Sequence, residues 1–171
     1  MTALMIGLRL IHIVAGVFWA GSVFFVVRFL LPALRASGPA GGQVMQQIAG
    51  KLRYGTAAMG AGLLTILSGL GMYWRNVKMS SGTWGSSAPG MTYGIGALAA
   101  ITALTVFATL GRPAGNQLLQ LGATIQSSGG PPSAEQASTL ARLQNRMAAA
   151  SRVAAALLAI AVIAMAVARY L

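Results

Sequence analysis

Side chains that bind metals or move protons are few in this sequence. The chain has one histidine, His12, one carboxylate side chain, Glu135, and no cysteine. Paired-carboxylate catalysis, a Ser-His-Asp triad and thiolate metal sites are therefore excluded, because each needs residues that the chain lacks. Glu135 lies at the expected start of a helix, where a negative charge is favourable, and we interpret it as structural.

His12 is the candidate ligand for a metal cofactor. Imidazole binds iron well through one nitrogen when a hydrogen bond holds the other. Ala15, Gly16 and Trp19 follow at three, four and seven positions, so in a helix they share one face with His12. They would form a shallow notch beside an aromatic ring, where the edge of a flat macrocycle fits. The alternative is that His12 makes a hydrogen bond between helices and Trp19 is part of the core.

Nine methionines raise the possibility of copper handling, since thioethers suit Cu(I). They form no Met-x-Met or Met-x-x-Met cluster, so we expect most of them to fill gaps in the core. Met72 and Met91 should lie towards the same side of the membrane as His12. Either could then serve as a further ligand to the metal of such a cofactor.

The elements that must position these residues are long apolar segments. The 171 residues are 56% hydrophobic and 8% charged, where a soluble domain has roughly 25% charged residues. Four runs are long enough to cross about 30 Å of hydrocarbon. They are continuous rather than alternating, which favours helices over a β-barrel. We predict one all-α domain over residues 1–171, an integral membrane four-helix bundle with spans at about 3–34, 54–74, 91–110 and 148–171.

The charges predict how the bundle is oriented. Twelve Lys and Arg side chains give a net charge of +11, but they stand singly at the ends of apolar segments, which argues against nucleic-acid binding and for contact with the lipid bilayer. Ion-coupled transport is disfavoured, because no carboxylate lies within an apolar segment. More cations lie near the loops 35–53 and 111–148 than near the other ends of the spans. We therefore predict that these loops are cytoplasmic and that both termini lie outside a bacterial-type inner (plasma) membrane. The eight cations on the cytoplasmic side are Arg28, Arg35, Lys51, Arg53, Arg112, Arg142, Arg146 and Arg152, and the four outside are Arg9, Arg75, Lys78 and Arg169.

The longer cytoplasmic loop is predicted to be a helical hairpin. Ser133 and Gln136 form a capping-box pattern, so the last helix should begin near Ala134 and continue into the fourth span. Pro113 suits a first helical turn, so the third span should resume there and reach about residue 127. The turn is expected at residues 129–132. Small residues in spans two to four predict close helix packing.

The stretch from Arg9 to Arg28 combines the histidine with a tryptophan seven residues later, a glycine, an aromatic pair and an arginine. This stretch resembles the first helix of the bacterial heme-dependent protoporphyrinogen oxidase family and the related copper-resistance protein D (CopD-like) membrane domain. The resemblance implies a four-helix membrane fold and, for the oxidase branch, a b-type heme on His12. The positions that match are His12, Trp19, Gly21, Phe24 and Arg28.

Two functions follow from these observations. The first is a redox-associated membrane protein that binds heme b, with His12 as the iron ligand and Gly16, Trp19 and Arg28 as cofactor-binding residues; Arg28 could instead reach the headgroups. The alternative is a non-catalytic accessory subunit that packs in a larger electron-transfer complex or a homo-oligomer. The oxidase branch is expected to carry a lysine in its third helix, and residues 91–110 have none. Catalytic residues therefore stay unassigned.

Overall fold

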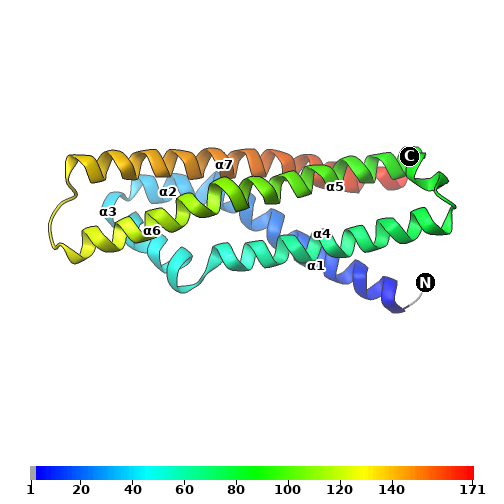
Figure 1. Ribbon diagram of the computed structural model, residues 1–171, viewed down its shortest axis with the longest axis horizontal. Helices are drawn as coiled ribbons and strands as arrows, with labels where there is room; N and C mark the ends of the chain where they lie inside the picture. The colour runs from blue at the N-terminus through cyan, green and yellow to red at the C-terminus, as the bar shows by residue number, and fades with distance from the viewer. Residues whose placement is uncertain (1–2) are drawn as a thin grey trace.

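The computed structural model describes residues 3–171 as a bundle of long helices (Figure 1). No strand occurs in this range, so the all-α fold class is confirmed. Short π-helical segments (η1, η2, η4) and 3-10 segments (η3, η5) continue or connect the α-helices. In chain order the elements are α1 (Ala3–Phe25), η1 (Val26–Leu30), α2 (Leu31–Ala36), α3 (Gly38–Met45), η2 (Gln46–Lys51), α4 (Tyr54–Met79), η3 (Thr83–Ser86), α5 (Ala88–Val106), η4 (Phe107–Gly111), α6 (Arg112–Ser127), α7 (Ala134–Val167) and η5 (Ala168–Tyr170).

Four continuous helical stretches are long and apolar enough to cross a membrane, which fits an integral membrane protein. They run over Ala3–Ala36, Tyr54–Met79, Ala88–Ser127 and Ala134–Tyr170. Each corresponds to one of the spans predicted from sequence and extends beyond it. The extension is largest for the third and fourth stretches, because α6 and the first part of α7 continue past the apolar residues.

The bundle has two different ends (Figure 1). The terminal end carries the start of α1, the end of α7 and the connection from α4 to α5. The hairpin end carries α2, α3 and the turn between α6 and α7. The expected hairpin is confirmed: Ser133 and Gln136 make both hydrogen bonds of a capping box, and Gly129 turns the chain with a φ of +68°.

The connection from α2 to α4 is helical, which the sequence analysis did not predict. Its helix α3 contains several glycines, which are unfavourable in a helix interior. One of them has a packing reason, because a Cβ on Gly41 would clash with the carbonyl oxygen of Leu34. The backbones of α2 and α3 can approach this closely only with glycine at that position.

Two spans change to π-helical geometry where they approach the hairpin end. Segment η1 contains Arg28, and η4 is followed at once by Arg112. The third span therefore does not stop and restart at Pro113; it runs through η4 into α6. A π-helical turn admits an extra residue without breaking the helix, so each of these spans reaches its cation at the hairpin end as a continuous rod.

Small residues dominate the core, as predicted. Trp19 is the one large aromatic side chain in a buried cluster of alanines and two leucines from α4, α5 and α7. Serine and threonine hydroxyls in the spans mostly donate back to carbonyls of their own helix, as Thr102 and Thr105 do. Within residues 3–171, two side-chain hydrogen bonds join different spans, and both join α1 to α4: His12 to Thr65 and Tyr54 to Ser22.

Candidate functional site

A cavity of about 650 Å³ lies at the terminal end of the bundle, between α1, α4, α5 and α7. The buried cluster around Trp19 closes the bundle on the hairpin side, and the cavity begins one layer farther out, at His12. Its size is within the range of small-molecule and cofactor sites, which is roughly 300 to 1,000 Å³. The lining combines apolar side chains, three sulfur atoms, three tyrosines, a tryptophan and three arginines.

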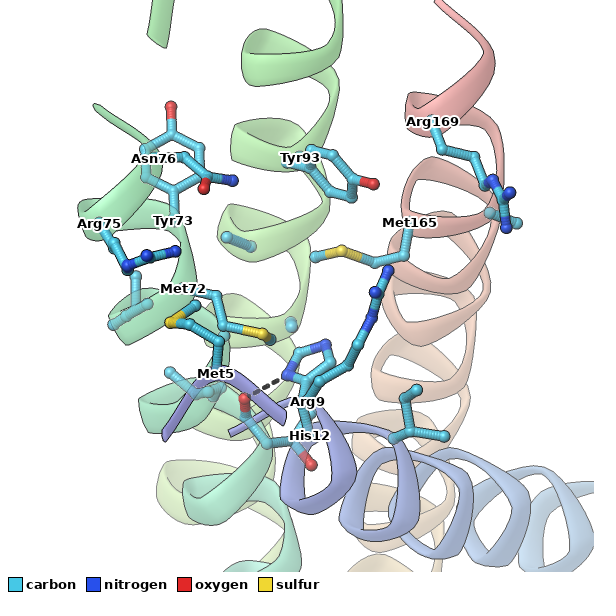
Figure 2. A pocket seen from close by; sticks show the side chains of 18 of the residues that line it. Met5, Arg9, His12, Met72, Tyr73, Arg75, Asn76, Tyr93, Met165 and Arg169 are labelled. Atoms are coloured by element: carbon cyan, nitrogen blue, oxygen red, sulfur yellow. Dashed lines mark hydrogen bonds between the residues drawn. The ribbon is translucent and has the colours of Figure 1, made fainter. Parts of the chain in front are cut away.

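His12 is held in one orientation on the cavity wall. Its Nδ1 atom lies 2.7 Å from the carbonyl oxygen of Thr65 in α4. A carbonyl only accepts hydrogen bonds, so Nδ1 carries the proton in the neutral ring, and Nε2 retains its lone pair. Figure 2 shows the ring with one nitrogen bonded to Thr65 and the other facing up the cavity. The imidazole is therefore inside the bundle, as expected, with its ligand atom directed to the open space.

Glycines of α4 make room for the large side chains of α1. A Cβ on Gly69 would lie 2.8 Å from Cε1 of His12, and one on Gly62 would lie 3.0 Å from Cε2 of Trp19. The two helices run antiparallel with a fixed register, in which residue 12 meets 69, residue 16 meets 65, and residue 19 meets 62. His12 and Trp19 are as far apart along α1 as Gly62 and Gly69 are along α4, so each ring lies opposite a glycine.

The notch expected beside His12 is filled. A Cβ on Gly16 would already be 3.4 Å from Cγ2 of Thr65, so the edge of a macrocycle has no space there. Trp19 is only 3% exposed and packs in the core without lining the cavity. Arg28 is exposed in η1, on the hairpin side of that core. Of the four residues predicted for cofactor binding, His12 alone lines the cavity.

On α1, the cavity is lined mainly by His12 and the turns that precede it, and not by the predicted notch that follows it. Met5 and Arg9 line it together with His12. These residues are spaced by four and three positions, so they share one helix face, and this periodicity is visible in the sequence. The predicted notch lies one turn too far along, because the sequence does not show that Trp19 is enclosed by the other helices.

Three thioethers line the cavity, from Met5 of α1, Met72 of α4 and Met165 of α7. Met72 was expected on this side and is present in the wall (Figure 2). Met91 was expected there too but does not line the cavity; it is 54% exposed on α5. Met5 could have been found from its helical spacing to His12, but Met165 could not, because only the folded bundle brings the two ends of the chain to one site.

An aromatic stack forms the wall between α4 and α5. The ring of Trp84 meets Tyr73 edge-on at 5.2 Å between centroids and stacks on Tyr93 at 5.9 Å. All three side chains line the cavity. Trp84 thus fixes the connection from α4 to α5 against the helices.

A second cavity, of about 850 Å³, lies at the hairpin end between α2, α3, α6 and α7. It is the larger of the two, but its lining has glutamines and one arginine and no histidine or tyrosine. It has two thioethers, from Met45 and Met147, but the imidazole, the tyrosines and most of the arginines lie at the terminal end.

His12 has no second histidine, cysteine or carboxylate beside it in the part of the chain that the structure describes. Residues 3–171 contain no group of three His, Cys, Asp or Glu side chains that could coordinate one. The possible donors that line the cavity are one imidazole nitrogen and the thioethers of Met5, Met72 and Met165, and three arginines lie on the walls. A macrocycle that brings its own ring ligands needs only one or two such donors from the protein.

Comparison of the chain with protein-family models, curated proteins and solved structures finds no match.

Proposed function

We propose that this chain is an integral membrane protein that binds a b-type heme in the terminal-end cavity, with His12 as an axial ligand to the iron. The observation that carries the proposal is the hydrogen bond from Nδ1 of His12 to the carbonyl of Thr65. This bond fixes the tautomer and directs Nε2 to the cavity, which is the arrangement that metal-bound histidines commonly have.

The rest of the lining supports the same cofactor. Apolar side chains such as Ile13 and Leu70 offer contact surface for a macrocycle, and the thioethers of Met5, Met72 and Met165 are candidate second ligands. Bound heme would supply one-electron redox chemistry. The chain would hold the iron through His12, surround the ring with apolar side chains and contact it through the other side chains that line the cavity.

We infer that both termini lie outside the plasma membrane, so the cavity opens to the outer side. This orientation rests on the excess of cations at the hairpin end. The hairpin of α6 and α7 would then project into the cytoplasm.

Absorption spectroscopy of the detergent-purified chain tests the proposal. We expect a Soret band and a reduced α-band in the unaltered protein, either as purified or after addition of hemin. His12→Ala should abolish both, and added imidazole should restore them by occupying the vacated ligand position. Met91→Leu is the matched control, because Met91 lies outside the cavity.

Two results would contradict this function. An unaltered protein that takes up no hemin would leave the accessory-subunit alternative as the better account. A His12→Ala variant that keeps its full heme content would show that another group holds the iron.

A further inference from the structure

Three arginines line the terminal-end cavity, and each comes from a different part of the bundle. Arg9 belongs to α1, Arg75 to α4 and Arg169 to η5 after α7. Figure 2 shows Arg9 extending from beside His12 up the cavity towards Met165. Arg169 lies farther out on the same side, and Arg75 is on the opposite wall. Three separate helices thus bring their positive charges to one opening.

No carboxylate side chain neutralises this opening. The only one in the chain, Glu135, lies in the first turn of α7 at the hairpin end. The guanidinium carbon of Arg169 lies 5.1 Å from the centroid of the Tyr170 ring, a contact that leaves its charge uncompensated. Cations that share an apolar opening repel one another, and an anion placed between them relieves that repulsion.

Contact with lipid headgroups does not account for the direction of Arg9. Arg9 and Arg169 are exposed and Arg75 is partly exposed, but Arg9 lies along the cavity rather than away from the bundle (Figure 2). Lys78, which is at the same end of the bundle, packs 4.3 Å from the centroid of the Trp74 ring and does not line the cavity. Arg169 also packs on an aromatic ring, so the three arginines differ from Lys78 in that they line the cavity.

We propose that Arg9, Arg75 and Arg169 bind the two carboxylates of an amphiphilic dianion, namely the propionates of the heme. This inference rests on the proposed function. Guanidinium groups bind carboxylates through two parallel hydrogen bonds, which an ammonium group does not reproduce. The propionate edge then faces the outer end of the cavity, and the apolar edge of the ring faces the buried cluster around Trp19. The ligand enters from the terminal end with its apolar edge first.

A comparison of hemin with its dimethyl ester tests this inference. The ester has the same ring and iron but no carboxylates. The full chain, freed of heme in detergent, is titrated with each compound and followed by absorption. We expect hemin to bind about 10-fold or more tightly than the ester, since a hydrogen bond to a charged group contributes about that much.

Arginine variants test which side chains bind the carboxylates of hemin. Arg9→Gln and Arg169→Gln should each weaken hemin binding about 10- to 100-fold and leave binding of the ester nearly unchanged. Arg9→Lys should recover only part of the affinity, because lysine lacks the planar fork. Arg146→Gln is the control, because this exposed arginine lies in the hairpin part of α7 and should change neither titration.

The outcomes separate the inference from the proposed function. Equal affinity for hemin and ester, with binding still dependent on His12, would overturn the carboxylate assignment and leave the heme function standing. Arginine variants that weaken hemin and ester equally would also overturn it, because the ester lacks the recognised charges. An unaltered chain that binds neither compound would overturn both proposals.

Discussion

Gly69 of α4 lies directly against the imidazole of His12, so that a Cβ at this position would come within 2.8 Å of Cε1 and 3.0 Å of Nδ1. The glycine therefore sets the position of the ring that bonds to Thr65. The chemistry of the histidine depends on a residue that itself carries no functional group.

Gly69→Ala should displace the imidazole and lengthen its hydrogen bond to Thr65. We expect heme affinity to fall about 10- to 100-fold, as it does when a group that orients a metal ligand is lost. The measurement is a hemin titration followed by absorption. Gly71→Ala is the matched control on the same helix, because its Cβ would meet Leu8 at an ordinary 3.6 Å. Equal affinity in the two variants would argue against the positioning role of Gly69.

Gly62→Ala should destabilise the bundle through its contact with Trp19. The added Cβ would lie 2.8 Å from Cδ1 of Leu104 and 3.0 Å from the indole. Overpacking of this kind costs roughly 1 to 3 kcal/mol. Gly60→Ala meets nothing within 4 Å and should be neutral or stabilising by up to about 1 kcal/mol, since alanine favours helix. Thermal unfolding in detergent compares the two; a Gly62 variant as stable as the Gly60 variant would count against the tight packing.

Single cysteines test the orientation in the membrane, and the chain has no cysteine of its own. Ser86 is exposed in η3 at the terminal end, and Ser128 is exposed at the tip of the hairpin. A membrane-impermeant thiol reagent should label Ser86→Cys in intact cells and Ser128→Cys only after permeabilisation. The opposite pattern would place the cavity on the cytoplasmic side.

Ser133→Ala should loosen the start of α7 without disturbing the spans. The hydroxyl of Ser133 accepts from the backbone N–H of Gln136, and loss of such a cap costs about 1 kcal/mol. Hydrogen exchange measured by mass spectrometry should become faster in peptides covering residues 134–140. Ser128→Ala is the control, because that hydroxyl donates to the carbonyl of Ile125 in its own turn. Unchanged exchange in the Ser133 variant would mean that the cap contributes nothing.

The sequence predicted the bundle better than the site. Continuous apolar runs and the Ser133 capping box indicated four spans and the hairpin, because both signals are local. The helix α3 was missed, since one of its glycines acts through close approach to α2, which is a tertiary contact. His12 was singled out as the candidate ligand by its residue type, by the small residues and tryptophan that follow it and by the resemblance of residues 9–28. Its cavity partners Met72 and Met165 come from different helices, and no local pattern links them.

The hydrogen bonds between spans divide the four long helices into two pairs, α1 with α4 and α5 with α7. Both of these hydrogen bonds join α1 to α4 within the described chain, so these two helices form one bonded unit. The helices α5 and α7 pack along each other through buried alanines, and their contact with the first unit is apolar. The terminal-end cavity lies between these two pairs of helices. No side-chain hydrogen bond described in residues 3–171 crosses this seam, so packing contacts, including the stack of Tyr73, Trp84 and Tyr93, hold the two pairs together. The bond that orients His12 lies within one pair, so a change in packing at the seam would leave it intact.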